Sequence, residues 1–276
     1  MARNPEIPDL GPRSGASGAS GATDGAQAIR RALDVARTVA ALQRSGATLS
    51  LVARSTGLKT STTFRILRSL VEERLLSYDA AGRCYHLGPL AYELGLVAAG
   101  DVQVQARLGW RESVEHIARD TGLTTYLMAR SDKEAVCLLC AQGTTVLRAM
   151  PMDVGQRVPL GIGAGSLALL ASLDDAEVHR ILDANAARLT MFPGGKQRAE
   201  ILDRVRRTRR QGYAMSTGTV VAGVTGVGIA LPAPDGGAQL ALSVSAVATE
   251  LDGKAVKRVA AILIEAGQQG KRTGER

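Results

Sequence analysis

Residues 48–73 read TLSLVARSTGLKTSTTFRILRSLVEE, which predicts two short helices separated by a glycine. The first helix begins at Leu49 and ends at Gly57, and the second begins directly afterwards, at Lys59. Apolar residues recur at helical spacing in the second helix and predict one apolar face: Phe64, Leu67, Leu70 and Val71. Two short helices joined by a tight turn with Gly, the second opening with Ser and Thr that can cap it, are typical of a helix-turn-helix.

A two-stranded wing is predicted after the second helix. Residues 75–78 and 83–87 read as short strands around the turn at 79–82, and Arg83 at this hairpin can reach a phosphate or the minor groove. From Lys59 to Arg68 the second helix has three basic groups and four hydroxyls but no acid. Guanidinium and hydroxyl groups are the ones that contact phosphates and base edges. The residues predicted to contact DNA are Ser50, Arg54, Lys59, Thr60, Ser61, Thr62, Thr63, Arg65, Arg68 and Arg83.

The alternative for this region is a small helical subdomain packed on a hairpin, without nucleic acid. Charge distribution favours the DNA-binding interpretation without deciding it. The chain of 276 residues has a net charge of +8, and residues 26–95 alone have ten basic and five acidic side chains. Positive charge is therefore densest around the predicted helix-turn-helix, as expected where affinity comes from counterion release at phosphates.

The three cysteines do not indicate a disulfide framework. Cys137 and Cys140 have a redox or zinc spacing but lie in an apolar run that predicts a buried strand, where residues three apart point to opposite faces. We expect no metal and no cofactor. No apolar run reaches the about 18–20 residues of a membrane span, and the start lacks the pattern of a signal peptide, so we expect a cytoplasmic protein without membrane contact.

The chain divides by pattern into three parts. Residues 1–25 are rich in Gly, Ser and Ala and predict a disordered tail. Residues 26–95 form the predicted DNA-binding domain, which opens with an amphipathic helix to about Arg44. Residues 96–276 form a second predicted domain, which includes a linker helix over 102–121.

Strand patterns dominate the third part. Strands are expected at 123–129, 135–142, 144–150, 213–220, 227–231 and 239–247, and helices at 167–173, 175–187, 200–211 and 253–266. Strands in hairpins with helices grouped around them predict an α+β domain with an antiparallel sheet, not a parallel doubly wound one.

The chain resembles IclR-family transcriptional regulators from about Ala26 to Gly267. The residues that carry the resemblance are Leu33-Asp34-Val35, Ala53, Thr56-Gly57-Leu58, residues 61–67, Tyr85-His86-Leu87-Gly88, Val158-Pro159-Leu160, Gly163-Ala164-Gly165, Gly212-Tyr213-Ala214 and Leu242-Ser243-Val244-Ser245. The resemblance implies a winged helix-turn-helix joined by a helix to an α+β effector-binding domain. It also implies homodimers or homotetramers on palindromic DNA operators.

The chain departs from the family pattern in both the DNA-binding domain and the effector-binding domain. Leu51 replaces a usual acid, and Lys59-Thr60 replaces a frequent Pro-Lys, so the operator sequence does not transfer. Gly161 replaces a frequent His and Thr219 a usual Glu, so the effector does not transfer either.

A ligand site is predicted at residues 161–166, where GIGAGS precedes a helix. Glycines leave backbone N–H groups unobstructed, and the positive end of a helix dipole favours an anion such as the carboxylate of a small organic acid. By resemblance, the residues around the pocket are Gly163, Ala164, Ser216, Gly226, Ser243 and Ser245. The alternatives are a tight loop whose glycines allow close packing and, less favoured, a dinucleotide fingerprint, for which no parallel βαβ unit follows.

An enzyme or a sensor with a Gly-rich anion-binding loop is the alternative function. Ser166 follows the glycines, yet the sequence has no nucleophile elbow, no local histidine and no clustered carboxylates. We therefore expect no catalytic residues.

Overall fold

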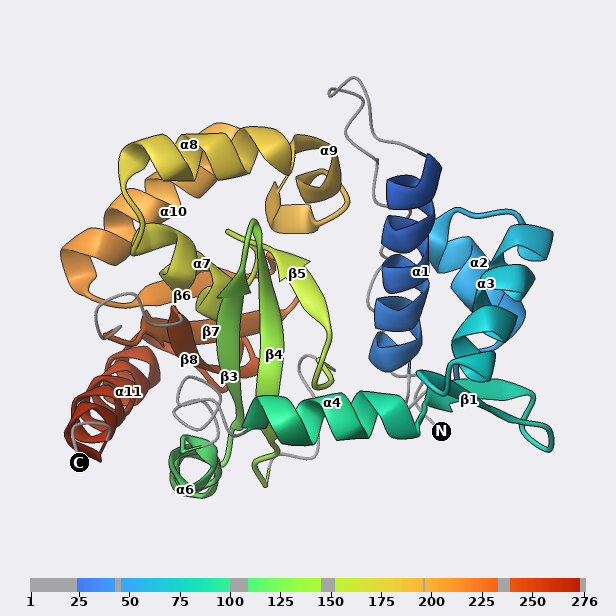
Figure 1. Cartoon of the computed structure of the whole chain (residues 1–276). Helices are drawn as coiled ribbons and strands as arrows, with labels where there is room; N and C mark the ends of the chain where they lie inside the picture. Colours follow the sequence, from blue (N-terminus) through green and yellow to red (C-terminus); the bar gives the residue numbers. More distant parts are fainter. Residues whose placement is uncertain are drawn as a thin grey trace. The chain divides into compact units, whose positions relative to one another are not determined.

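The chain folds into two compact units in the computed structural model, which describes residues 24–42, 46–99, 109–144, 152–195, 197–232 and 239–273 (Figure 1). One unit, called here the reader unit, contains the elements up to α4, and the other, called the sheet unit, contains those from α6 onward. Residues 1–23 of the predicted tail lie outside the described residues.

The reader unit is the predicted winged helix-turn-helix. Its elements are α1 (Asp24–Ala41), α2 (Leu49–Thr56), α3 (Thr60–Glu72), β1 (Leu76–Asp79), β2 (Cys84–Leu87) and α4 (Pro89–Ala99). One apolar core joins the three helices to the wing: Val35, Val39, Ala47, Val52, Leu67, Leu76 and Tyr85. The apolar faces of short helices are buried only by this packing, which is what stabilises helices of such length.

The wing is a two-stranded antiparallel hairpin. Leu76 pairs with Leu87 and Asp79 with Cys84. The Asp79 carboxylate closes the turn by accepting the N–H groups of Ala81 at 2.9 Å and of Gly82 at 3.1 Å. Such Asx turns occur because a short carboxylate reaches the backbone two residues on.

The sheet unit is built on one antiparallel sheet with the strand order β5-β4-β3-β8-β7-β6. Its strands are β3 (Thr124–Ser131), β4 (Glu134–Ala141), β5 (Arg157–Pro159), β6 (Ala214–Thr217), β7 (Val224–Ala230) and β8 (Leu240–Val247). Its helices are α6 (Arg111–Thr121), α7 (Ala164–Ala171), α8 (Asp175–Ala184), α9 (Ala186–Leu189), α10 (Arg198–Gln211) and α11 (Gly253–Thr273), with a 3-10 turn η1 (Pro193–Gly195). The predicted α+β class is confirmed.

The two faces of the sheet differ because side chains alternate along each strand. One face carries an apolar layer from the central strands, which packs on α6 and α11: Leu127, Ala129, Val227, Ile229, Leu242 and Val244. The other face carries smaller and more polar residues and packs on α7: Tyr126, Met128, Gly226, Gly228, Ser243 and Ser245. In Figure 1, α10 and α8 lie beyond α7 on this side.

Several boundaries differ from the predicted ones. The helix expected at 175–187 is interrupted at Asn185, whose amide Nδ2 donates to the carbonyl of Lys133 at 2.7 Å and ties the break to the β3–β4 turn. Strand β5 was not predicted, because three residues are too few for alternation to be visible. Residues 145–150 of the strand expected at 144–150 lie outside the described residues, as does the first part of the linker helix, 102–108.

Candidate DNA-reading surface and effector pocket

The turn between α2 and α3 sets the position of the reader helix. Thr48 caps α2 by accepting the N–H of Leu51 at 3.4 Å. Gly57 ends α2 with φ of 67°, the left-handed conformation that glycine adopts without a steric cost, and its N–H donates to the carbonyl of Arg54. Helix α3 then begins at Thr60 and runs for 13 residues.

Most residues predicted to contact DNA are on the surface of the reader unit. Exposed residues are Ser50, Arg54, Lys59, Thr60, Ser61, Arg65, Arg68 and Arg83, and Thr62 is half-buried. Arg68 Nε donates to Glu72 Oε1 at 2.9 Å in an exposed pair, which is too weak to withhold the guanidinium from a phosphate. Arg83 lies in the wing turn with φ of 50°. Four of these residues line one groove of about 680 Å³: Ser50, Thr60, Arg68 and Arg83.

Thr63 does not fit the predicted role. Its side chain is fully buried, and its hydroxyl donates to the carbonyl of Lys59 at 3.2 Å. It occupies the face of α3 that packs on the core, so it is not available to DNA. Leu67, Leu70 and Val71 of the predicted apolar face pack in the core, but Phe64, which was assigned to the same face, is 47% exposed.

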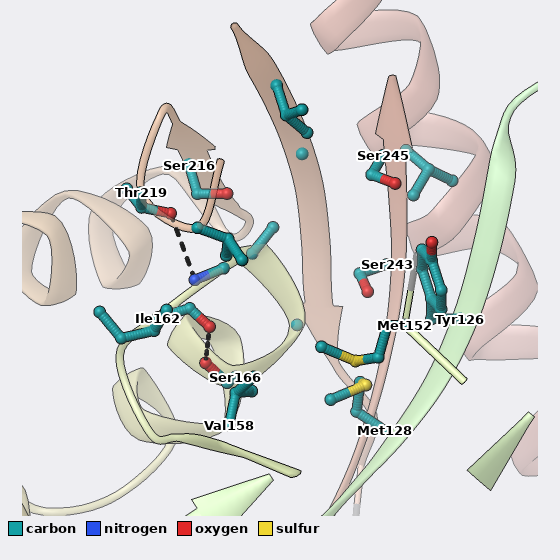
Figure 2. A pocket seen from close by; sticks show the side chains of 17 residues that line it. Tyr126, Met128, Met152, Val158, Ile162, Ser166, Ser216, Thr219, Ser243 and Ser245 are labelled. Carbon is teal, nitrogen blue, oxygen red and sulfur yellow. Dashed lines mark hydrogen bonds between the residues drawn. The ribbon is translucent and has the colours of Figure 1, made fainter. Parts of the chain in front are cut away.

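The six residues predicted to bind a ligand line a single cavity in the sheet unit. Gly163 and Ala164 belong to the start of α7, and Gly226 belongs to β7. Ser216 on β6 and Ser243 and Ser245 on β8 are labelled in Figure 2. The cavity has a volume of about 30 Å³, enough for about two water molecules. No charged side chain is among the described residues that line it.

The start of α7 presents backbone donors to this cavity. Gly163 N–H donates to Thr219 Oγ1 at 3.3 Å, whereas the N–H groups of Ala164, Gly165 and Ser166 have no acceptor among the described residues. All three residues are buried, so an acceptor for these groups has to lie inside the cavity. Helix N-termini with free N–H groups and a positive dipole end are suited to anions.

Two serine hydroxyls on β8 point into the same cavity (Figure 2). Ser243 and Ser245 lie two residues apart and therefore share a face of the sheet. Ser245 is 5% exposed, and its Oγ has no hydrogen-bond partner in the described part of the chain. Ser166, by contrast, donates its hydroxyl to the carbonyl of Ile162 and is not available as a nucleophile.

Thr219, which the sequence marked as a departure that bears on the effector, also lines the cavity, whereas Tyr126, Met128, Met152 and Val220 were missed. A signal for two of them was present. Tyr126 pairs with Ser243 across the β3–β8 ladder, and Met128 lies two residues further along the same face of β3. The others lie in loops, and no periodic pattern in the sequence predicts which loops pack against the sheet.

The remaining reactive groups have structural roles. Burial raises the pKa of the Cys137 thiol well above its ordinary value, so the thiol stays protonated. The prediction that Cys137 and Cys140 point to opposite faces is wrong, because a β-bulge between them pairs Cys140 with Tyr126 and Cys137 with Met128, which share one face of the sheet. Among the described residues, no group of three or more His, Cys, Asp or Glu side chains could hold a metal ion. In the same part of the chain, no helix has the length and apolar character needed to span a bilayer.

A winged helix-turn-helix unit, together with an α+β unit that encloses a small cavity, defines a DNA-binding regulator with a ligand-binding domain. Residues 28–80 match the IclR helix-turn-helix domain, and residues 104–272 match the family described as bacterial transcriptional regulator IclR C-terminal. The chain belongs to the IclR family. It is a DNA-binding transcriptional regulator and not an enzyme.

Curated relatives and solved structures agree with this assignment. The chain is 26% identical over 232 residues to the HTH-type transcriptional repressor AllR of Salmonella typhi, covering 83% of each chain. It is 25% identical over 204 residues to the regulator XynR of Escherichia coli K12, covering 73% of this chain and 79% of that one. A crystal structure of an IclR regulator from Alicyclobacillus acidocaldarius has 25% identity and a TM-score of 0.67, covering 88% of this chain and 97% of that chain.

Proposed function

We propose that this regulator binds operator DNA as a dimer or tetramer and that a small monocarboxylate in the sheet-unit cavity changes its affinity for DNA. Residues 26–95 would supply the DNA contacts, and residues 96–276 the linker and the effector site. The single observation that carries the ligand class is the set of buried N–H groups of Ala164, Gly165 and Ser166, which have no acceptor among the described residues.

The carboxylate assignment follows from the cost of leaving such groups unsatisfied. A buried donor without an acceptor costs about 1–3 kcal/mol, so three of them strongly favour an acceptor that reaches them together. A carboxylate has two oxygens and a negative charge that the start of α7 attracts. The hydroxyl of Ser245 adds a fourth donor in the same cavity.

The rest of the cavity restricts the ligand to one charge. No acid or base lines it among the described residues, so a second carboxylate or an amine would be buried without a counter-ion. The body of the ligand would contact apolar side chains, among them Met128, Val158 and Val220, with Tyr126 and Ser243 offering polar groups. An IclR homolog from Microbacterium hydrocarbonoxydans, 22% identical with a TM-score of 0.69, has been crystallised with 4-hydroxybenzoate, a monocarboxylate with an uncharged polar body.

The cavity must expand to hold such a ligand. A volume of about 30 Å³ is far below the about 300 Å³ of even a small ligand pocket. Met128 and Met152 line it, and methionine side chains change shape at low cost. Ligand binding would therefore favour a wider arrangement of the sheet unit, and a ligand that binds two arrangements with different affinity is what effector control requires.

Self-association is supported by apolar side chains on the outside of the reader unit. On α4, Tyr92, Leu94, Leu96 and Val97 are between 55% and 82% exposed, and on α1 Ile29 is 64% exposed. Contiguous exposed apolar residues of this kind mark protein interfaces. A dimer would place two reader units on a palindromic operator, because protein two-fold symmetry is mirrored in the DNA site.

Calorimetry on the full chain tests the ligand class. We expect 4-hydroxybenzoate or a related monocarboxylate to bind, and the amide of the same skeleton to bind at least about tenfold more weakly, since it lacks the charge attracted by α7. Ser245→Ala should weaken binding, whereas Ser172→Ala, which removes a hydroxyl bonded within the far end of α7, should not. Equal binding of amides and acids would contradict the anion site.

A further inference from the structure

Phe64 is an exposed aromatic residue on the reader helix, although its spacing predicts a core position. It is 47% exposed and is not part of the apolar core of the reader unit. Thr63 and Leu67 are fully buried, so α3 packs on the core through the face that carries these two residues, and the Phe64 ring lies outside that face. Phe64 therefore does not stabilise the core. Its ring lies on the surface of the helix that also carries Arg65 and Arg68.

The ring lines the groove between α3, the first turn of α2 and the wing. Hydroxyls of Thr48, Ser50 and Thr60 lie along this groove, and Tyr78 and Tyr85 form an aromatic pair in its wall with ring centroids 4.9 Å apart. Two arginines and one glutamate line it, and the glutamate is paired with one of the arginines. Its net charge is therefore positive.

Three side chains along α3 have the spacing and the chemistry needed to contact successive base pairs in a DNA major groove. Thr60, Phe64 and Arg68 are each four residues apart and form one stripe on the helix. The stripe covers eight residues, roughly 12 Å, which equals three to four base-pair steps. Hydroxyl and guanidinium groups contact phosphates and base edges, and an apolar ring contacts the 5-methyl group of thymine.

We propose that Phe64 is a base-reading residue whose ring contacts a thymine methyl group in each operator half-site. This inference rests on the DNA binding proposed above and adds a specificity-determining residue outside the predicted contact set. The stripe places the thymine within one to three base pairs of the bases or phosphates that Thr60 and Arg68 contact.

The test begins with selection of the preferred site from a random duplex library by the full-length wild-type chain. Each thymine of the selected site is then replaced singly by deoxyuridine, which removes only the methyl group. At one thymine per half-site we expect wild-type affinity to fall about fourfold, the value of one buried methyl group. The Phe64→Ala variant should bind the thymine and deoxyuridine duplexes equally at that position.

The controls separate this proposal from the DNA-binding proposal itself. Leu87→Ala removes another exposed apolar side chain, on β2, and should keep the wild-type response to deoxyuridine. Because Phe64 is half-exposed, its truncation should leave the melting temperature nearly unchanged. If wild type and Phe64→Ala respond alike at every thymine, the reading role is wrong although DNA binding stands. If the wild type selects no site, the proposed operator binding fails as well.

Discussion

Glu134 is the most deeply buried carboxylate in the described part of the sheet unit, and its charge is balanced by two arginines. Arg157 donates to Oε2 at 3.1 Å and Arg188 to Oε1 at 2.6 Å, while Glu134 is only 6% exposed. The group connects β4, β5 and α9. Removing the carboxylate leaves two largely buried positive charges side by side.

Glu134→Gln should therefore lower the free energy of unfolding by about 3 kcal/mol, because an uncompensated buried charge is costly. The measurement is urea unfolding of the full chain at neutral pH. Asp203→Asn, which breaks an exposed pair with Arg206, is the matched control and should change stability by less than about 0.5 kcal/mol. Equal effects of the two substitutions would show that the buried group contributes no more than a surface pair.

Glu177 gives the sheet unit a dependence on pH. The hydrogen bond from Arg180, followed by that from Arg130, lowers the pKa of its carboxyl from 4.5 to about 2. A lowered pKa in the folded state means that the stabilisation is complete above pH 4.5 and is lost as the pH falls towards about 2.

Wild type should accordingly be more stable than Glu177→Gln at pH 6, and the difference should shrink steadily between pH 4.5 and 2. Denaturant unfolding of both proteins at several pH values measures it. A difference that stays constant across this range would mean that the two arginines do not hold the ionised form.

Residue-level prediction from sequence rested on different signals at different sites. The family resemblance predicted that Gly163, Gly226, Ser243 and Ser245 lie around one pocket, and they line one cavity, whereas ligand binding by them stays a prediction. Phe64 and Thr63 were assigned to the wrong faces, because hydrophobicity alone places Phe inside. The hydroxyl of Thr63 can be buried because it bonds to the carbonyl of Lys59 within its own helix.

At the scale of elements, α7 lies unusually close to the sheet. A Cβ on Gly228 would lie 2.9 Å from the Ala164 carbonyl carbon and 3.0 Å from Gly165 N, and one on Gly165 would lie 2.8 Å from Ser243 Oγ. Glycines at these positions let the start of α7 reach the strands that carry the serines. The close approach is what brings the backbone donors and the hydroxyls into one cavity.

Gly228→Ala should lower stability by about 1–3 kcal/mol, because the added methyl group meets backbone atoms that cannot move aside locally. It should also weaken ligand binding by displacing the start of α7. Gly253→Ala at the start of α11, where nothing lies within 4 Å, should leave stability unchanged or raise it by up to about 1 kcal/mol. Thermal unfolding and calorimetry of both variants check this, and a stable, ligand-binding Gly228→Ala protein would contradict the packing argument.

Most helices and strands could be predicted because their apolar residues repeat regularly over several residues. The helices of the reader unit and the strands β3, β4, β7 and β8 all have apolar repeats over several residues. Helix α7 begins at Ala164, not at the predicted residue 167, because its first turn consists of small residues that read as a loop. Which loops close over the sheet depends on contacts far apart in sequence, and these leave no periodic signal.

At the scale of the whole molecule, the exposed apolar side chains of α4 determine the proposed assembly. Leu94→Glu together with Val97→Glu should reduce the particle mass to that of one 28.8 kDa chain, because two charges would be buried in the interface. Sedimentation velocity measures the mass. Met215→Glu, at an exposed apolar residue of β6, is the control and should keep the wild-type mass. Unchanged assembly of the α4 double variant would place the interface elsewhere.

The central claim is that one small anion in the sheet unit controls DNA binding by the reader unit. The most direct test is the fluorescence anisotropy of a labelled duplex, carrying the site selected by the wild-type chain, at fixed salt with and without a saturating monocarboxylate that binds in calorimetry. We expect the dissociation constant for DNA to change by at least about fivefold, a typical allosteric coupling, and Ser245→Ala to need more ligand for the same change. A ligand that saturates the cavity while leaving the dissociation constant for DNA the same would contradict the claim.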